Sequence, residues 1–403
     1  MLRVCFPFIG GGIGGSHISA VELIREVPRH GINPLVVVHQ QGPLADFLRG
    51  EGIRFSLLRW SKFAAGHEPT YSDDKRLAKA ARWRFAWYLR RNRIDIVHTN
   101  DIRVGCTWLP AAAAGGARFV WHQRTPGSRH TFNHFAARAD RIICPSLYVR
   151  DRIFENINSA FLKKDFGWAK ILCVRNPISL SSTSTTHLGR IDTRSFPRVG
   201  LIANEWSRKR PEIFVATASQ VLKSLPAAEF LIAGEFSDEG KLQLLSPWPK
   251  AVTKRVKFLG FVEDRSSLFG RIDILLAPAV NEGFGRTLVE AMLAGVAVIA
   301  ADSGGHQEIV EHGTTGLLVP VDDVEGFAAA VCVLAHDSKM RSRLIRTAQL
   351  RVDKLYDPRA IAREMAEIYR GLKQFGLIKQ LKQISEDWRW LHSKEDEEEA
   401  LWP

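Results

Sequence analysis

The chain has 403 residues, of which 45% are apolar and 25% are charged, a composition typical of a soluble globular protein. A chain of this length is too long to fold around a single hydrophobic core, and it predicts two domains. No apolar run reaches the roughly 18–20 residues of a membrane-spanning helix, so no such helix is predicted.

The five cysteines are scattered and lack Cys-x-x-Cys spacing, which argues against both a disulfide framework and a zinc site. The first residues run directly into a glycine turn and lack a small-residue cleavage site. This start indicates a first strand and not a signal peptide. Both observations favour a cytoplasmic location.

The net charge of +13 is confined to the first part of the chain. Residues 1–180 contain 27 Lys and Arg against 13 Asp and Glu, whereas residues 181–403 contain 29 against 30. A basic half predicts a polyanionic partner, and charge alone does not choose among anionic lipid, nucleic acid and an acidic glycan.

The chain opens with a strand, a glycine loop, a helix and a second strand. Strands are predicted over Arg3–Ile9 and Asn33–His39, and the loop over Gly10–Gly15 leads into a helix that ends at Pro28. The loop matches the dinucleotide fingerprint G-x-G-x-x-G, but the second strand ends without the acidic residue that NAD requires. We therefore favour a loop that approaches the phosphates of another nucleotide, with a purely structural turn as the alternative.

Residues Asp73–Arg93 predict a helix with eight Lys and Arg and no acidic residue from Lys75 onward, interleaved with four aromatic residues. One interpretation is a helix that covers the sheet with its aromatic face and exposes its charges. The other is that its basic face lies on an anionic membrane, with part of the aromatic set at the interface.

Four later strands of the first half end in polar residues. The predicted strands and the residues that follow them are Ile94–His98 before Asn100, Arg118–Trp121 before His122, Arg141–Pro145 before Ser146, and Ile171–Val174 before Asn176. A histidine just past a strand end is well placed to meet a substrate, so His122 is a candidate site residue.

The low-periodicity stretch 181–197 is rich in Ser and Thr and predicts a linker between two α/β domains. The predicted organisation is an N-terminal Rossmann-like domain over 1–180, a second Rossmann-like domain over 198–355, a helix over 356–375 that packs back toward the first domain, and a mixed, acidic tail over 376–403. The fold class is therefore α/β with two parallel sheets.

The stretch from Asn281 to Gly295 follows an apolar strand and leads into a helix. Glycines at such a turn lie at the carboxyl edge of the sheet, where the backbone approaches a ligand and the helix N-terminus favours a phosphate. Glu282 lies on the loop and Glu290 on the helix, so two carboxylates are expected to face one polyhydroxylated ligand. Phe284 is either a core residue or a lid over the sugar.

These features resemble the retaining nucleotide-sugar glycosyltransferases of family 4, which have the GT-B fold. The resemblance is strongest over residues 255–330 and covers the first half more loosely. It is carried by two glutamates with seven residues between them, Glu282 and Glu290, and by several motifs. The motifs are Gly260-Phe261-Val262, Asn281-Glu282-Gly283-Phe284-Gly285, Gly304-Gly305, Glu308-Ile309-Val310 and Leu318-Val319-Pro320.

The resemblance implies a cleft between two domains, with the acceptor on the first and the nucleotide-sugar on the second. It implies catalytic or leaving-group roles for three residues and nucleotide contacts for ten. The first three are His122, Lys209 and Glu282; the ten are Gly11, Gly12, Gly14, Arg208, Gly283, Phe284, Gly285, Thr287, Leu288 and Glu290. Glu282 would contact sugar hydroxyls and Glu290 the ribose. The family usually has an arginine where this chain has Leu201, so the choice of phosphate cation stays open among Arg208, Lys209 and Arg210.

No Asp-x-Asp motif occurs in the chain, so the leaving pyrophosphate is expected to be stabilised by this cationic loop and a helix N-terminus instead of a metal ion. No cofactor is expected beyond a UDP- or GDP-sugar donor. The sequence thus predicts hexose transfer with retention to a glycan or lipid-linked acceptor, in polysaccharide or lipopolysaccharide biosynthesis, by a cytoplasmic protein that binds the membrane peripherally. Alternatives are a sugar-nucleotide epimerase or phosphorylase of the same fold, and a basic protein that binds nucleic acid, although no nucleic-acid recognition motif is found.

Overall fold

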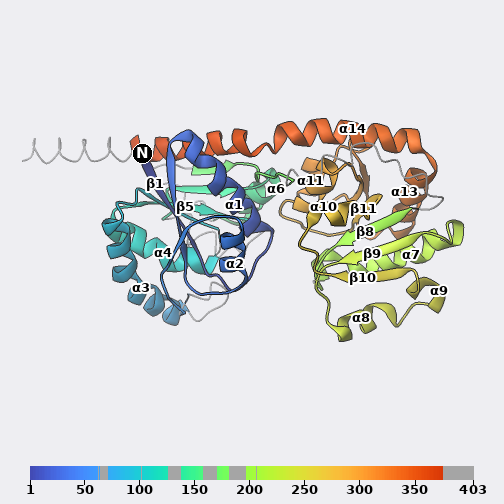
Figure 1. Cartoon of the computed structure of the whole chain (residues 1–403), viewed down its shortest axis with the longest axis horizontal. Helices are drawn as coiled ribbons and strands as arrows, with labels where there is room; N and C mark the ends of the chain where they lie inside the picture. Colours follow the sequence, from blue (N-terminus) through green and yellow to red (C-terminus); the bar gives the residue numbers. More distant parts are fainter. Residues whose placement is uncertain are drawn as a thin grey trace, which may run out of the picture.

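The computed structural model describes residues 1–61, 63, 71–100, 102–125, 138–157, 170–180, 197–205 and 207–374. The predicted linker, apart from residue 197, and the predicted tail lie outside these residues. The described chain forms two α/β units that lie side by side, each built around a parallel sheet (Figure 1).

The first sheet has seven parallel strands in the order β3-β2-β1-β4-β5-β6-β7. The strands are β1 Leu2–Phe8, β2 Ile32–Val38, β3 Phe55–Leu57, β4 Ile96–Thr99, β5 Arg118–His122, β6 Arg141–Cys144 and β7 Ile171–Cys173. The strands are mostly buried on both faces, which is why they read as continuous apolar runs in the sequence.

Helices cover both faces of this sheet. One face carries α3 (Tyr71–Arg91), α4 (Ile102–Gly115) and α6 (Leu147–Asn156), whose core includes the stacked rings of Phe85 and Trp108. The other face carries α1 (Gly15–Glu26), the short α2 (Pro43–Gly50) and residues 358–374, which are also helical.

The segment 358–374 crosses from the second unit back to the first. In Figure 1 it continues from α14 (Ser338–Leu355) along the edge of the molecule and lies over the first sheet. Its apolar residues recur at helical spacing and are buried in the core of the first unit; they are Ile361, Ala362, Met365, Ala366, Tyr369 and Leu372. The core of the first unit is therefore completed by residues that follow the second.

The second sheet has six parallel strands in the order β10-β9-β8-β11-β12-β13. They are β8 Arg198–Ile202, β9 Glu229–Ala233, β10 Val256–Gly260, β11 Ile274–Ala277, β12 Ala297–Ala301 and β13 Leu317–Val319. The helices around them are α7 Pro211–Ser224, α8 Asp238–Leu245, α9 Lys250–Thr253, α10 Arg265–Phe269, α11 Arg286–Leu293, α12 His306–Ile309 and α13 Val324–His336, together with α14. Two 3-10 turns complete the described elements, η1 Val27–His30 and η5 Ser207–Lys209.

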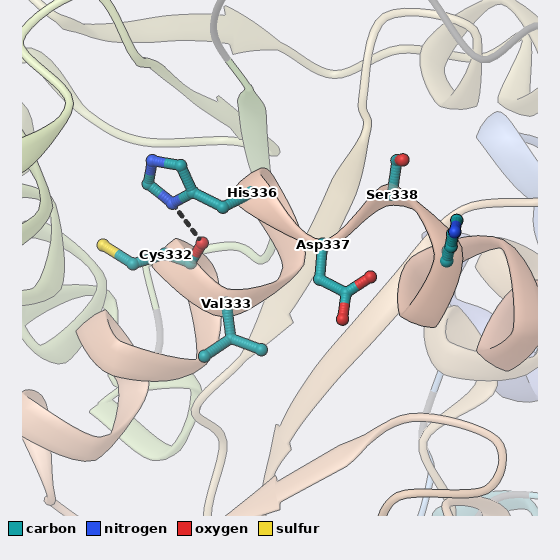
Figure 2. Close-up of a pocket in the computed structure, with 6 residues that line it drawn as sticks. Cys332, Val333, His336, Asp337 and Ser338 are labelled. Carbon is teal, nitrogen blue, oxygen red and sulfur yellow. Dashed lines mark hydrogen bonds between the residues drawn. The ribbon is translucent and has the colours of Figure 1, made fainter.

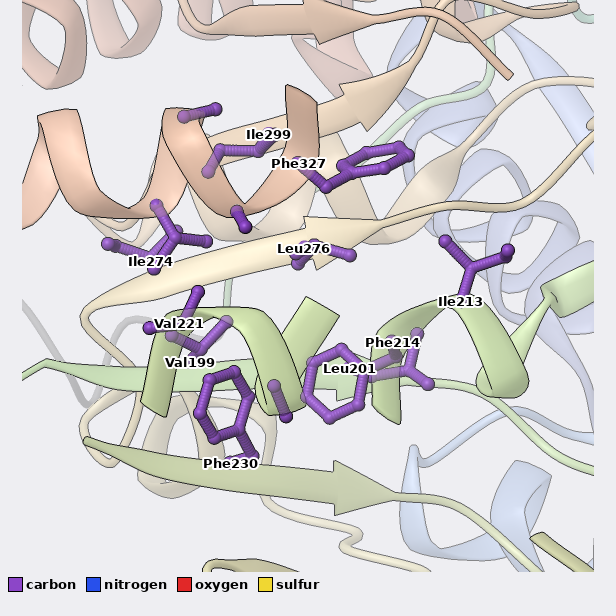
Figure 3. Close-up of a cluster of buried hydrophobic side chains, with 14 of the residues drawn as sticks. Val199, Leu201, Ile213, Phe214, Val221, Phe230, Ile274, Leu276, Ile299 and Phe327 are labelled. Carbon is purple, nitrogen blue, oxygen red and sulfur yellow. The ribbon is translucent and has the colours of Figure 1, made fainter. Parts of the chain in front are cut away.

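The core between this sheet and helices α7 and α13 is shown in Figure 3. Phe214 of α7 and Phe230 of β9 meet edge to face with ring centroids 5.6 Å apart, and both are fully buried. On the other face, α10, α11 and α14 pack on the same strands.

We expect Phe230→Ala to lower the free energy of unfolding by about 3–5 kcal/mol, because the substitution removes buried surface and leaves a cavity. Phe230→Leu should cost less, and Leu242→Ala on the exposed face of α8 should stay within about 0.5 kcal/mol. Denaturant titration of the three variants checks this, and equal losses for Phe230→Ala and Leu242→Ala would contradict it.

Candidate active site

The glycine loop after β1 lies at the carboxyl edge of the first sheet. Gly10 has φ +109°, and a Cβ there would lie 2.3 Å from the Gln40 carbonyl oxygen, so only glycine fits. Gly11, Gly12 and Gly14 are exposed. A side chain at Gly12 would meet nothing within 4 Å, which leaves that backbone open to a ligand.

The loop between β11 and α11 lies at the corresponding edge of the second sheet. Gly285 is the N-cap residue of α11 and has φ +102°, and a Cβ there would lie 2.9 Å from Cδ2 of His306. The Gly283 carbonyl accepts a 2.5 Å hydrogen bond from Oγ of Ser146, which begins α6 in the first unit. The two carboxyl edges are thus in direct contact through this loop.

Glu282 is held by two cations from the loop after β8. Its Oε2 accepts from Nη1 of Arg208 at 2.7 Å and from Nζ of Lys209 at 2.8 Å. Burial alone would raise the pKa of Glu282, but the charges of Lys209 and Arg208 outweigh it and lower the pKa to about 2. At neutral pH Glu282 is therefore an ionised hydrogen-bond acceptor and not a proton donor.

Arg210 points away from this cluster. It forms ion pairs with Glu212 and Asp322, both of which lie outside the site. Among the three cations proposed for phosphate, the structure therefore brings only Arg208 and Lys209 to Glu282.

Glu290 is buried on α11 and is paired with Arg286 one turn earlier. Arg286 Nε donates to Glu290 Oε1 at 2.6 Å, and Nη1 donates to Ser19 Oγ of α1 at 2.8 Å and to the Pro177 carbonyl at 3.3 Å. Arg286 thus joins the second unit to the helix that follows the glycine loop. The other oxygen of Glu290 is buried without a hydrogen-bond partner, and it can accept from a ligand.

The other three residues predicted to contact the nucleotide near α11 differ in how deeply they are buried. Phe284 is a core residue, since its ring is buried and lies edge to face against Tyr356. The Leu288 side chain is also buried in the core, and its backbone N–H donates to the Gly285 carbonyl. Thr287 is partly exposed.

His122 is the last residue of β5 and belongs to a buried chain of three hydrogen-bonding side chains. Its Nδ1 lies 3.2 Å from His98 Nε2, and His98 Nδ1 lies 2.5 Å from the hydroxyl of Tyr369 on the crossing segment 358–374. His122 Nε2 is buried and has no partner. Burial first, and then the charge of Arg124, lowers the pKa of His98 to about 3 and that of His122 well below its usual value, so both rings are neutral.

The direction of these hydrogen bonds follows from the tyrosine. Its buried hydroxyl hydrogen needs an acceptor, and His98 Nδ1 is the hydrogen-bond partner that the described part of the chain gives it. If Tyr369 donates to His98 Nδ1, His98 Nε2 carries the proton and donates to His122 Nδ1. His122 then carries its proton on Nε2, which makes that nitrogen a donor.

Several of these residues were not predicted. Arg286 precedes Glu290 by four residues on one helix, a spacing that predicts an ion pair, so the sequence did hold a signal for it. Tyr369 and His98 are 271 residues apart, and no local pattern indicates their contact.

Within the described ranges, no group of three His, Cys, Asp or Glu side chains could hold a metal ion. All five cysteines are free. A shallow depression at the α13–α14 turn is lined by Cys332, Val333, His336, Asp337, Ser338 and Lys339 (Figure 2). Its polar groups serve local helix ends, since His336 Nδ1 lies 2.8 Å from the Cys332 carbonyl and Asp337 caps α14, and no predicted site residue lines it.

Two family models match the chain. Residues 13–160 match the model for glycosyltransferase family 4, and residues 196–337 match the model for glycosyl transferases group 1. The chain belongs to glycosyltransferase family 4.

Solved structures with the same architecture identify the fold of this family 4 member as GT-B. HepE of Anabaena in complex with UDP-glucose has a TM-score of 0.73 and 20% identity, over 92% of this chain and all of that chain. A glycosyltransferase from Rickettsia africae has a TM-score of 0.74 and 18% identity, over 92% and 98%.

Relatives identified by sequence include a phosphatidyl-myo-inositol mannosyltransferase of Mycolicibacterium smegmatis, 32% identical over 42% of this chain and 44% of the relative. The match thus spans less than half of that protein. The lipopolysaccharide core biosynthesis glycosyltransferase LpsE of Rhizobium meliloti is 21% identical over 83% of this chain and 89% of the relative.

The buried histidines predict a loss of stability in acid. Burial lowers the pKa of His39 and that of His306 to about 4. Burial is also the main reason why the pKa of His98 is lowered to about 3. A histidine in the unfolded chain has a pKa near 6.5. The unfolded state therefore takes up protons that the folded state does not. We expect the free energy of unfolding to be constant above pH 6.5 and to fall toward pH 4, by about 1.4 kcal/mol per pH unit for each such histidine.

Denaturant titration between pH 7.5 and 4.5 measures this slope. His39→Asn should reduce the slope by the contribution of one histidine. A free energy of unfolding that does not change between pH 6.5 and 4.5 would contradict the assignment of neutral, buried rings.

Proposed function

We propose that this protein is a glycosyltransferase that moves a hexose from a UDP- or GDP-sugar to a glycan or lipid-linked acceptor, with retention of anomeric configuration. The observation that carries the proposal is the meeting of two carboxyl edges, where Ser146 of the first unit donates to the Gly283 carbonyl and Arg286 of the second donates to Ser19. Beside this contact the second unit holds Glu282 paired with two cations and Glu290 paired with Arg286. The solved complex of HepE with UDP-glucose, which shares the fold, supports a nucleotide-sugar donor.

The proposed roles follow from charge and burial. Arg208 and Lys209 would pass from the Glu282 carboxylate to the donor phosphates, together with the backbone of Gly283 and Gly285 at the start of α11. Glu282, released from one of its cations, would accept hydrogen bonds from sugar hydroxyls. The unpartnered oxygen of Glu290 would accept from the ribose. Because cations and a helix N-terminus supply the positive charge, we propose that transfer needs no metal ion and proceeds in EDTA.

We further propose that the product belongs to a cell-surface polysaccharide or lipopolysaccharide. The relatives named for lipopolysaccharide core biosynthesis and for phosphatidyl-myo-inositol support an acceptor of that kind. In the described part of the chain, no helix is long and apolar enough to cross a membrane. We propose that the protein reaches a lipid-linked acceptor through a surface that binds the bilayer from the cytoplasmic side.

The exposed face of α3 provides that surface. Phe85 and Tyr88 are buried in the first core, whereas Trp83 and Trp87, one turn apart, are 64% and 62% exposed. The guanidinium carbons of Arg82 and Arg91 lie 5.0 and 5.4 Å from the centroids of Trp83 and Trp87. Tryptophan beside arginine on one helix face suits the interface of an anionic bilayer. The first interpretation of this helix describes its buried face, and we propose the second for its exposed face.

We expect Lys209→Met to weaken binding of the nucleoside diphosphate about 10- to 100-fold, since a charged hydrogen-bonding partner is lost, and to leave binding of the corresponding nucleoside unchanged. Glu290→Gln should weaken both, because its partner is the ribose. Calorimetry with UDP and uridine, or with GDP and guanosine, measures the dissociation constants of both ligands for each variant and for the wild type.

Lys254→Met and Glu263→Gln on exposed positions serve as controls. A wild-type protein that binds neither UDP, GDP nor their sugars at millimolar concentration would contradict the proposed function. Loss of nucleoside binding in Lys209→Met would contradict the phosphate role alone.

For the membrane surface, we expect the protein to co-sediment with phosphatidylglycerol vesicles and not with phosphatidylcholine vesicles. Replacing both Trp83 and Trp87 with alanine should weaken binding, and each of Arg84→Gln and Arg91→Gln should weaken it about fivefold. Phe261→Ala, at an aromatic residue that is 58% exposed on the other unit, should have no effect. Equal binding to both vesicle types, or tighter binding to random duplex DNA than to anionic vesicles, would contradict this surface.

A further inference from the structure

Arg124 is a guanidinium at the carboxyl edge of the first sheet, and its hydrogen-bond partners in the described part of the chain are neutral. Its Nε and Nη2 donate to Oδ1 of Asn100 at 3.1 and 2.5 Å, and its Nη1 donates to Oδ1 of Asn176. Asn100 follows β4 and Asn176 follows β7, so Arg124 lies where the ends of three strands meet. A guanidinium has five N–H groups, and these contacts use three, which leaves one on each terminal nitrogen.

The charge of Arg124 has no counter-charge among the residues that the structure describes. Burial, followed by the nearby positive charge of Arg286, lowers the pKa of Arg124 to about 9. Arg286 itself is matched by Glu290. The Arg124 side chain is partly exposed at this edge. A charge that has lost much of its hydration and has no partner of opposite sign destabilises a folded protein, and a ligand of opposite charge removes that cost.

A second donor accompanies Arg124. His122 lies two residues before it, both imidazoles of the His98–His122 pair lie within its electrostatic influence, and His122 Nε2 is buried without a partner. Because Tyr369 donates into this chain, His122 Nε2 carries a proton. Arg124 and His122 therefore present N–H groups and one net positive charge.

We propose that Arg124 and His122 together bind an anionic oxygen group, a carboxylate or a phosphate, on the acceptor. The inference rests on the proposed function and adds the chemical class of the acceptor to it. Both side chains belong to the first unit, whereas the cations proposed for the donor phosphates, Arg208 and Lys209, belong to the second. Two N–H groups on a guanidinium and one on an imidazole match the several lone pairs of such an anion.

The test uses the full chain with the donor site filled by UDP or GDP, whichever the wild-type protein binds more tightly. Glucuronate and glucose differ by one carboxylate and form a matched pair of probes, and inorganic phosphate is the third. With ionic strength held constant by sodium chloride, we expect glucuronate and phosphate to raise the melting temperature and to bind in calorimetry, and glucose to do neither.

Arg124→Gln should weaken glucuronate binding at least about tenfold and Arg124→Lys by less, with the affinity for the nucleotide unchanged within about twofold. Arg271→Gln, at an exposed position of the second unit, is the matched control and should change nothing. Tyr369→Phe should also weaken glucuronate binding. Without the tyrosine hydroxyl, His98 Nε2 is free to accept a hydrogen bond from His122 Nδ1, and His122 Nε2 then has no proton to donate to the anion.

Three results would overturn the proposal. One is a wild-type, nucleotide-bound protein that binds glucose as well as glucuronate, or neither. Another is an Arg124→Gln variant that loses nucleotide and glucuronate affinity equally, which would assign the anion to the donor. The third is a lower melting temperature in Arg124→Gln with unchanged anion binding, which would make Arg124 a structural tie between strands. Failure to bind any nucleotide refutes the proposed function instead, and the anion titration is then read on the unliganded protein.

Discussion

Both sheets consist only of parallel strands, and this constraint determines where chemistry is possible in the molecule. Every strand of a parallel sheet ends at the same edge, so the polar residues that follow the strands collect there. Here the carboxyl edges of two sheets meet, and the contact from Ser146 to the Gly283 carbonyl joins them directly. This meeting of carboxyl edges brings together the residues of the candidate site, namely the glycine loop, His122, Arg208, Lys209 and Glu282.

In the described residues, the cations at the joined edge of the second unit are paired with carboxylates, whereas Arg124 at the edge of the first unit is not. Glu282 neutralises part of the charge of Arg208 and Lys209, and Glu290 neutralises Arg286. Among the residues that the structure describes, the hydrogen-bond partners of Arg124 are amide oxygens. A ligand with phosphates must therefore compete with Glu282 for its cations, whereas an anion at Arg124 displaces no carboxylate. Binding of the donor phosphates would thus exchange one ion pair for another at Glu282. Binding of an anion at Arg124 would add a counter-charge without breaking an ion pair.

The sequence was sufficient for the fold and for the positions of most strands, because buried parallel strands leave apolar runs that end in glycine or polar turns. It was insufficient where contacts join distant segments. Glu282 and Lys209 are 73 residues apart, and their ion pair could be placed only by the tertiary structure. Helix α14 was not predicted, although Leu344, Ala348 and Val352 recur at helical spacing on its buried side. Six of the seven strands of the first sheet were predicted. The edge strand β3 was not, because its three residues, none of them fully buried, form no apolar run.

The crossing segment 358–374 has a consequence for the order in which the protein acquires its structure. The core of the second unit contains, apart from Ile178, residues between 199 and 356, so it is complete once they have been synthesised. The core of the first unit contains Ile361, Met365 and Tyr369 and must wait for them. A nascent chain ordinarily folds from its N-terminal domain onward. In this protein the earlier half leaves the ribosome with one face of its sheet covered only by α1 and α2, and the core of the half that is synthesised second is complete first.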